Sequence, residues 1–441
     1  MLSKQRKEEW SHINYSLNFL GFEDIDLKEL DVEENKTSVS VYVTLARSKN
    51  IICPSCKSDK LYSCGYKTKV INHKHFTGKS CNIIWKKRRY KCIQCGKTFY
   101  EYNPFCLSQK DNYSTETVLY VLEELANIGT FKTVAIIAGL NTKQVIDIFD
   151  RYVNIPRESL PKCLGIDEFH NRSTGSGKYA CILINNSDSH PSIVDIIEDR
   201  TVDKLSYYFQ HIGRDERNNV KYFVSDMYEG YRSIHETYFP HSIHIIDTFH
   251  FVRLFTEAFN RIRIRIMKSY PTNSQEYDIM KTYWKTLMMP SYKLHTNKTH
   301  YQRFGRSLDQ KELLNIILSK DEDLYHAYLI KEDFVCNYYR IKYEKAEVYL
   351  DRLIDRMKNT GFEEYDEVSR SLRKWKEQII NSFIRDKDGR RITNAMTEGF
   401  NNSVKVIKRT SYGYANFKRF RNRILYVLRE KSTFKIWTKV I

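Results

Sequence analysis

The sequence contains no apolar run that approaches the roughly 20 residues of a membrane-spanning helix, and its longest apolar stretches, such as TVAIIAGL, are short. The first residues, MLSKQRKEEWSH, are charged and lack the apolar core of a secretory signal peptide. Internal repeats and low-complexity linkers are absent as well. These absences argue against a membrane or secreted protein, and we expect a cytoplasmic protein with no membrane partner.

Acidic residues are outnumbered, because 54 Asp and Glu face 72 Lys and Arg, which gives a formal net charge of +18. Such an excess raises the local concentration of polyanions, and nucleic acid is the commonest polyanion that a soluble protein meets. An anionic membrane is the competing interpretation, which the missing apolar runs weaken. The 441 residues leave room for two to four structural units of about 100–200 residues each.

Cysteine is too dilute for a disulfide scaffold, and four of the 10 cysteines form two CxxC pairs. In a reducing compartment, paired CxxC motifs predict metal binding, whereas scattered cysteines are small core residues. Together the pairs can supply four thiolates to one tetrahedral Zn²⁺. The predicted ligands are Cys53, Cys56, Cys92 and Cys95. The pairs are further apart than the roughly 15–20 residues of compact ribbons, so we expect an extended hairpin between them. The alternative is a site completed by Cys64, Cys81, His73 or His75.

Two helix predictions concern the N-terminal third. HINYSLNFLGF, residues 12–22, reads as an apolar-rich helix ahead of the alternating strand TSVSVYVTLARS. Residues 113–153 read as three helices, punctuated by Gly129 and Gly139. Asn141 or Thr142 is suited to cap the last of them. The short AGLN turn fits a helix-turn-helix, whose second helix would present Lys143 and Gln144 to a DNA major groove. Any small trihelical unit gives a similar pattern.

From residue 161 the pattern changes to strands. LGIDEF, KYACILIN and SIVDIIED read as successive strands, followed by the helix VDKLSYYFQHIG. The strand KYFVSD, the helix YEGYRSIHETYF and the strand HSIHIID follow. Three strands, helix, strand, helix, strand is the plan of an α/β ribonuclease H-like domain. In that plan the strands that carry Asp167 and Asp226 are neighbours.

Three acids occupy positions where the local sequence predicts an exposed carboxylate on a rigid element. Asp167 follows the apolar residues of KCLGID, Asp226 ends KYFVSD, and Glu398 lies early in the helix-like TNAMTEGFNNSVKVIKR. Carboxylates that converge from separate elements can hold the two Mg²⁺ or Mn²⁺ ions of a phosphoryl-transfer site. The structural alternatives are that the aspartates are solvated acids at strand ends and that Glu398 is an acid at a helix start, stabilised by the helix dipole.

Other groups near these acids are suited to assist. Asp247 and His250 form a DTFH cluster after the fifth strand, where the acid can support a ligand and the histidine can donate to a phosphate, or simply pack. Asp247 also ends a strand, so it competes with Asp226 as second metal ligand. Glu168 is a weaker catalytic candidate. The aromatic rings of Phe169, Tyr412 and Tyr414 are suited to stack on unpaired bases.

The face of the Glu398 helix is mixed basic and amide. Asn402, Lys405 and Arg409 recur at helical spacing from Glu398, and Lys408 lies in the same segment. Such groups suit phosphate oxygens, so we predict DNA contacts for these four residues. An ordinary solvated helix face is the alternative. The tail NFKRFRNRILYVL reads as a basic amphipathic helix.

After Asp247 the strand signals stop and helical spacing dominates. These patterns predict a zinc ribbon at 1–108 and a helix-turn-helix at 109–156. A ribonuclease H-like core would begin at 157–250 and resume at 391–441 with the Glu398 helix and the basic C-terminal helix. A long helical insertion at 251–390 would separate its two parts.

At this point the sequence resembles a known family, the bacterial insertion-sequence transposases of the DDE class and the ISL-three type. The resemblance rests on CPSC, RRYKCIQCGKTF, LGIDEF, SDMYEGY, FPHSIHIIDTFHFVR and, most specifically, TNAMTEGFNNSVKVIKRTSYGYANFKRFRNRI. It implies an enzyme that binds the terminal inverted repeats of its element, cuts their ends with Mg²⁺ and joins the 3′ ends to target DNA. By position, Asp167, Asp226 and Glu398 match the catalytic acids of the family, and DTFH resembles the DxxH element of related transposases.

Double-stranded DNA is thus the expected partner, and holding two ends together implies a homodimer in the synaptic complex. Two rival functions use the same modules. A sequence-specific regulator would not need the acids, and a structure-selective nuclease would not need specific ends.

Overall fold

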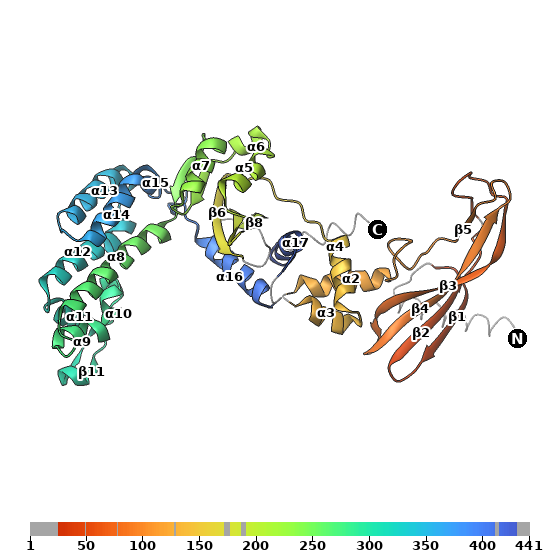
Figure 1. The fold of residues 1–441 in the computed structure, drawn as a ribbon, viewed down its shortest axis with the longest axis horizontal. Helices are drawn as coiled ribbons and strands as arrows, with labels where there is room; N and C mark the ends of the chain where they lie inside the picture. The colour runs from red at the N-terminus through yellow and green to blue at the C-terminus, as the bar shows by residue number, and fades with distance from the viewer. Residues whose placement is uncertain are drawn as a thin grey trace. The chain divides into compact units, whose positions relative to one another are not determined.

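The computed structural model describes residues 25–429, except 49, 77, 128, 172–176, 187–190 and 411–413. The helix predicted at 12–22 therefore lies outside the described residues. The chain divides into two compact units (Figure 1). The first comprises Met1–Ile155, Val406–Tyr414 and Asn422–Ile441, and the second comprises Pro156–Lys405 and Ala415–Arg421. No helix in the described part of the chain is long and apolar enough to cross a membrane.

A five-stranded sheet begins the first unit. Its strands are β1 (Leu27–Glu34), β2 (Ser38–Leu45), β3 (Leu61–Phe76), β4 (Lys79–Cys92) and β5 (Thr98–Tyr100), in the order β1-β2-β4-β3 with β5 on β4. The long β3–β4 hairpin is the extended hairpin that the spacing of the CxxC pairs predicts. Alternate residues of β4, including Cys81, Ile83 and Trp85, are buried, because side chains of a strand point to opposite faces in turn.

Three helices follow in the same unit: α2 (Thr115–Ala126), α3 (Phe131–Ala138) and α4 (Thr142–Tyr152). The predicted cap is confirmed for Asn141, whose side chain accepts from the backbone N–H of Gln144. α3 ends at Gly139, whose φ of 69° is the left-handed conformation that glycine adopts without strain. A three-residue turn therefore joins α3 to α4.

The second unit contains the predicted mixed sheet. Its strands are β6 (Cys163–His170), β7 (Tyr179–Asn185), β8 (Ser192–Ile197), β9 (Tyr222–Ser225) and β10 (Ile243–Ile246), in the order β10-β9-β6-β7-β8. β6, β7 and β8 pair antiparallel, whereas β6, β9 and β10 are parallel. The helices between them are α5 (Val202–Gln210), α6 (Arg214–Asn218) and α7 (Glu229–Tyr238). The predicted order of strands and helices is confirmed, with α6 as an additional short helix.

A helical region follows β10. Its helices are α8 (Thr248–Ser269), α9 (Gln275–Thr282), α10 (Trp284–Met288), α11 (Gln310–Leu318), α12 (Glu322–Asn337), α13 (Tyr343–Lys358), α14 (Glu363–Lys374) and α15 (Lys376–Asn381). Short 3-10 turns occur at Ser291–Lys293, Gln302–Phe304 and Tyr338–Arg340. Phe255 and Phe334 stack in its apolar core with ring centroids 4.0 Å apart. The expectation that strands end at Asp247 was wrong, because β11 (Thr299–Tyr301) and β12 (Arg306–Leu308) form a small hairpin there.

Two helices end the described chain, α16 (Ala395–Thr410) and α17 (Phe417–Leu428). Each contributes residues to both compact units. Within the first unit, the buried guanidinium of Arg423 donates to the carbonyls of Asn127 and Gly129 at 2.7 and 2.8 Å. Within the second, Arg421 Nε donates to Asp195 Oδ1 on β8 at 2.6 Å. The basic residues of α17 are thus partly structural.

Arg421→Ala is expected to destabilise the protein by about 3 kcal/mol, because it leaves the Asp195 carboxylate charged in a buried place. The Asp195 side chain is only 5% exposed, and its other oxygen accepts from Tyr208 at 2.8 Å. Chemical denaturation monitored by circular dichroism measures the change. Arg253→Ala is the control, since its pair with Glu257 is exposed and such pairs contribute about 0.5 kcal/mol or less. Equal effects of the two variants would contradict this account.

Candidate active site

Three aspartates lie in one row across the parallel strands of the second unit. The last paired residues are Gly165 with Val224, and Ser225 with Ile246. Continued past these pairs, the register aligns Asp167 on β6 with Asp226 after β9 and Asp247 after β10. Adjacent strands are about 4.8 Å apart, so Asp226 is one strand from Asp167, whereas Asp247 is two strands away. In strand order, Asp226 is therefore the closer of the two to Asp167.

The Asp167 carboxylate is held by two donors. Its Oδ1 accepts from the backbone N–H of Glu168 at 2.7 Å, and its Oδ2 accepts from Asn401 Nδ2 on α16 at 2.8 Å. The pKa of Asp167 is raised to about 6, chiefly by burial and also by the charges of Glu168 and Asp247, while the two hydrogen bonds oppose the shift. Asp167 thus lies among negative groups in a site that is poorly hydrated.

Asp226 has fewer partners. Its Oδ1 is buried and has no hydrogen-bond partner in the described part of the chain. The pKa of Asp226 is raised to about 7, chiefly by burial and also by the charges of Glu168 and Asp167, while Arg200 opposes the shift. A buried carboxylate oxygen without a donor is costly unless something else binds it. The donor set of Asp226 and Asp167 therefore fits a hard divalent cation.

Asp247 and His250 form a local pair at the start of α8. Asp247 occupies the N-cap position, and the backbone N–H of Asn394 approaches its Oδ1 at 3.4 Å. Burial raises the pKa of Asp247, and His250 opposes that shift. Burial lowers the pKa of His250, while Asp247 raises it. Asp247 thus has His250 and backbone N–H groups beside it, whereas the Oδ1 of Asp226 has no hydrogen-bond partner in the described part of the chain.

α16 reaches the sheet through a buried polar face. Asn394, just before the helix, donates from Nδ2 to the carbonyl of Ile166 at 3.3 Å and accepts from Asn186 at 2.8 Å. Asn401 lies two turns further along, on Asp167. Gly165 leaves room for this contact, because a Cβ there would lie 2.4 Å from Asn186 Nδ2 and from Asn394 Oδ1. The glycine of LGID thus lets α16 approach β6.

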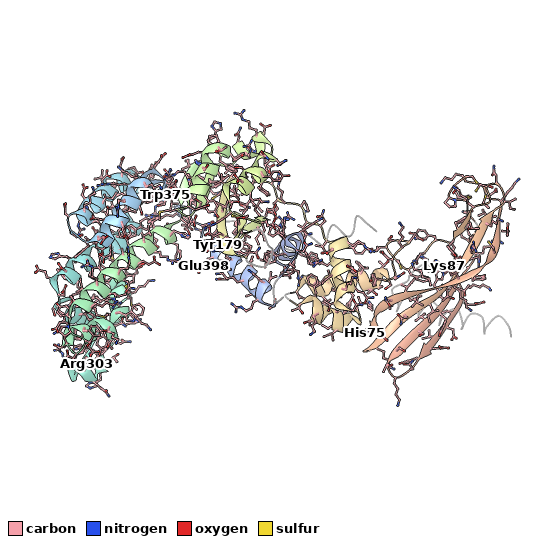
Figure 2. All side chains as sticks on the ribbon, viewed as in Figure 1. His75, Lys87, Tyr179, Arg303, Trp375 and Glu398 are labelled. Carbon is pink, nitrogen blue, oxygen red and sulfur yellow. The ribbon has the colours of Figure 1, made fainter. Side chains whose placement is uncertain are left out.

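Glu398 lies on α16 one turn before Asn401, on a neighbouring exposed face (Figure 2). Among the described residues its carboxylate has no hydrogen bond or ion pair within the distances that define them. Asn402, Lys405 and Arg409 are exposed on the same face, as the spacing predicts. Lys408 is half-buried on the other side, and burial lowers its pKa. The face that carries Glu398 is available to an anionic ligand.

Sequence reasoning missed Arg200 as a neighbour of the acids. Arg200 Nη1 donates to Glu168 Oε1 at 2.5 Å, and its guanidinium lies over the rings of Tyr179, labelled in Figure 2, and Tyr228 at 4.4 and 4.7 Å. Tyr231 donates to the other oxygen of Glu168 at 3.2 Å. Glu168 is thus paired with an arginine that two tyrosine rings hold in place, and the two residues are too far apart in the sequence for any local pattern to connect them.

The base-stacking hypothesis for Phe169 was wrong. Phe169 is buried and packs edge-on against Phe420 with ring centroids 6.0 Å apart. Tyr414 is buried too, against Phe131 in the first unit. Tyr412 lies outside the described residues.

The first unit contains a cysteine cluster that is compatible with zinc. The sulfurs of Cys53, Cys56, Cys92 and Cys95 all lie within 4.8 Å of one another. Cys53 Sγ and Cys95 Sγ are 3.6 Å apart, and Cys56 Sγ and Cys92 Sγ 3.5 Å, near the ~3.8 Å between thiolates on a tetrahedral Zn²⁺. Backbone N–H groups lower the pKa of Cys53 to about 6 and lower that of Cys92 as well, whereas, against a backbone hydrogen bond from Ser58, burial and the neighbouring cysteines raise the pKa of Cys56 to about 12.

The alternative zinc ligands have other environments. Cys64 is exposed on β3, whereas Cys81 is buried in the apolar core of the sheet. The ring of His73 is hydrogen-bonded to Ser114 at 2.8 Å. The predicted quartet of two CxxC pairs is therefore the set that the fold gathers.

The two residues predicted to read DNA differ in their surroundings. Lys143 is exposed in the first turn of α4. Gln144 is half-buried, and its Oε1 accepts from the backbone N–H of Asn141 at 2.8 Å in a capping box. That acceptor is thereby occupied, so Lys143 is the freer of the two for a ligand.

The sequence was compared with models of known protein families. The model of the ISL3-type DDE transposase family, described as transposase, matches residues 164–424. The chain belongs to this family. The match spans β6 through most of α17 and includes Asp167, Asp226, Asp247 and Glu398. A comparison with curated proteins found no match.

Proposed function

We propose that this transposase binds the terminal inverted repeats of an insertion sequence, cleaves the DNA ends by two-metal phosphoryl transfer and joins the 3′ ends to target DNA. The observation that carries the proposal is the row of acids across β6 and β9, with α16 anchored on Asp167. The strand order β10-β9-β6-β7-β8 supports a ribonuclease H-like core, in which the first and fourth strands are neighbours.

Asp167, Asp226 and Glu398 would hold Mg²⁺ or Mn²⁺. The unpartnered Oδ1 of Asp226 and the free carboxylate of Glu398 support this set, because both are hard oxygen donors without a protein partner among the described residues. Bound divalent ions supply charge stabilisation for the attacking and leaving oxygens of an in-line displacement. Asp247, which already has His250 beside it, would position that histidine instead of binding metal.

The other residues of the site would handle the substrate. Lys405 and Arg409, on the face of Glu398, are suited to donate to phosphate oxygens. His250 is suited to donate to the scissile phosphate. In the first step water attacks the phosphodiester and frees a 3′ hydroxyl. In the second step that hydroxyl attacks a target phosphodiester, and a target 3′ oxygen leaves.

Recognition of the ends would fall to the first unit. The zinc ribbon and the helix pair α3–α4 would act together, with the N-terminal turn of α4 in the major groove. Lysine and arginine contacts to phosphate would set the register, and base contacts would set the specificity. Two ends must be held at once, so we propose a homodimer in the synaptic complex, acting in the cytoplasm.

A strand-transfer assay tests this function. Full-length protein, Mg²⁺, labelled duplex that carries the element's end and a target plasmid should yield a covalent end-to-target product. A duplex with a scrambled end is the control and should yield none. Cleavage of both duplexes alike would indicate a structure-selective nuclease. Specific binding with no Mg²⁺-dependent product under any condition would indicate a regulator.

Lys143→Ala is expected to weaken binding of the end duplex about tenfold and binding of the scrambled duplex much less, because a lost base contact costs about 1–3 kcal/mol. Fluorescence anisotropy at fixed salt measures both affinities. Lys311→Ala removes the same charge from an exposed position on α11 and is the matched control. Equal losses on the two duplexes would mean that Lys143 contacts only phosphate.

A further inference from the structure

Asn401 is a buried side chain whose position the acidic residues do not explain. It is 7% exposed, and its Nδ2 donates to Asp167 Oδ2 at 2.8 Å. Its own Oδ1 is buried and has no hydrogen-bond partner in the described part of the chain. An amide oxygen that is buried without a donor is costly, so a group that binds oxygen belongs beside it.

The orientation of this amide is fixed by its neighbour. If oxygen and nitrogen of Asn401 were exchanged, Oδ1 would face the Oδ2 of Asp167, and two acceptors would meet. The amide must therefore point its NH₂ group at Asp167. In this orientation the Oδ1 of Asn401 has no hydrogen-bond partner among the described residues.

Several oxygens around Asp167 share the need for a positive partner. Oδ1 and Oδ2 of Asp167 each accept one hydrogen bond and keep a second lone pair. The Oδ1 of Asp226, on the neighbouring strand, has no donor. Oxygen donors of these kinds suit a divalent cation, on which adjacent octahedral oxygens lie about 3 Å apart. A hydrogen-bonded amide and carboxylate can meet that spacing.

We propose that Asn401 is an additional oxygen ligand of the divalent cation that Asp167 binds. Its NH₂ group fixes the carboxylate of Asp167, and its Oδ1 completes the coordination of the same ion. This inference rests on the proposed function, because the ion is that of the phosphoryl-transfer site. An amide is a suitable ligand here because it adds no charge beside Asp167, Asp226 and Glu168, which already repel one another.

Calorimetric titration of Mn²⁺ into the full-length protein, freed of Mg²⁺ and Mn²⁺ but with its zinc retained, tests the proposal. Asn401→Ala is expected to weaken Mn²⁺ binding about 10–100-fold. Asn401→Asp is nearly isosteric and keeps an oxygen while losing the NH₂ donor, so it should bind Mn²⁺ at least as tightly as the wild type. Asn315→Ala, at an exposed position on α11 outside the site, is the matched control and should bind within about twofold of the wild type.

The outcomes separate a ligand from a positioning residue. If Asn401→Asp binds Mn²⁺ as weakly as Asn401→Ala, the amide only positions Asp167 and the ligand role is overturned. Should Asn401→Ala not fold, the comparison of Asn401→Asp with the wild type decides alone. Asp167→Asn distinguishes a failure of the Asn401 role from a failure of the metal site itself. If it abolishes binding while Asn401→Ala preserves it, only the role of Asn401 fails, whereas unchanged binding by Asp167→Asn would overturn the metal site and with it the proposed function.

Discussion

Asp226→Asn is expected to reduce strand transfer by roughly 10³-fold or more, because it removes a charged ligand from a metal site whose charge stabilisation lowers the barrier by several kcal/mol. Asp247→Asn is expected to cost only about 10–100-fold, since Asp247 is two strands from Asp167 and acts on His250. Single-turnover rates with end-bearing duplex in Mg²⁺ measure both. An active Asp226→Asn beside an inactive Asp247→Asn would exchange the two assignments.

Asp226→Asn should also make the protein more stable than the wild type when no divalent ion is bound beside the acids. The pKa of Asp226 is raised from an ordinary value near 3.8 to about 7 in the folded protein. An acid whose folded pKa is raised destabilises the fold above that pKa, and the penalty disappears as pH falls toward the unfolded pKa. In buffer without Mg²⁺ or Mn²⁺ at pH 8, with the zinc of the first unit retained, Asp226→Asn should therefore raise the free energy of unfolding by at least about 1 kcal/mol. The difference from the wild type should shrink at pH 5. An unchanged free energy of unfolding at pH 8 would mean that burial does not destabilise the ionised Asp226 carboxylate.

Cys92→Ser is expected to abolish zinc binding and unfold the sheet of the first unit. Structural zinc contributes roughly 10–16 kcal/mol of apparent binding free energy in small zinc domains, more than this sheet can replace. Cys92 is fully buried among the four sulfurs. Mass spectrometry of the intact protein measures the zinc content. Limited proteolysis of the full-length protein, with the cuts within residues 25–108 identified, measures the unfolding of the sheet.

Cys64→Ser is the matched control for that experiment. It makes the same change in the same sheet, at an exposed position on β3 outside the cluster. It should keep one zinc ion per chain and wild-type resistance to protease. A Cys92→Ser protein that keeps its zinc and its protease resistance would contradict the assignment of the cluster.

The sequence predicts those elements whose signal is local. LGIDEF, KYACILIN and SIVDIIED are apolar runs of strand length, and all became strands of the mixed sheet. The Asn141 cap follows from a polar side chain next to a helix start. The spacing within each CxxC pair brings two sulfurs close together, so the cysteine cluster is predictable from the sequence. The pairing of β2 with β4 is not predictable in this way.

Other features depend on contacts that no local pattern reveals. β1, LKELDVEE, is too charged to read as a strand and forms because β2 pairs with it. Arg200 and Glu168 meet only once β6 and the chain after β8 are folded. Asn401 gives no local signal that sets it apart from Asn402, because only the packing of α16 on β6 buries the first amide and leaves the second exposed.

The central claim is that β6, the end of β9 and α16 together carry the ligands of the divalent-ion site. Fe²⁺ can replace Mg²⁺ in oxygen-ligand sites, and with ascorbate and peroxide it cleaves the polypeptide next to where it binds. Mass spectrometry of the fragments from the full-length protein should show cuts near Asp167, Asp226 and Glu398, all suppressed by excess Mg²⁺ and absent in Asp167→Asn. Cuts near Asp167 and Asp247 without Asp226, or no cut near Glu398, would contradict the account.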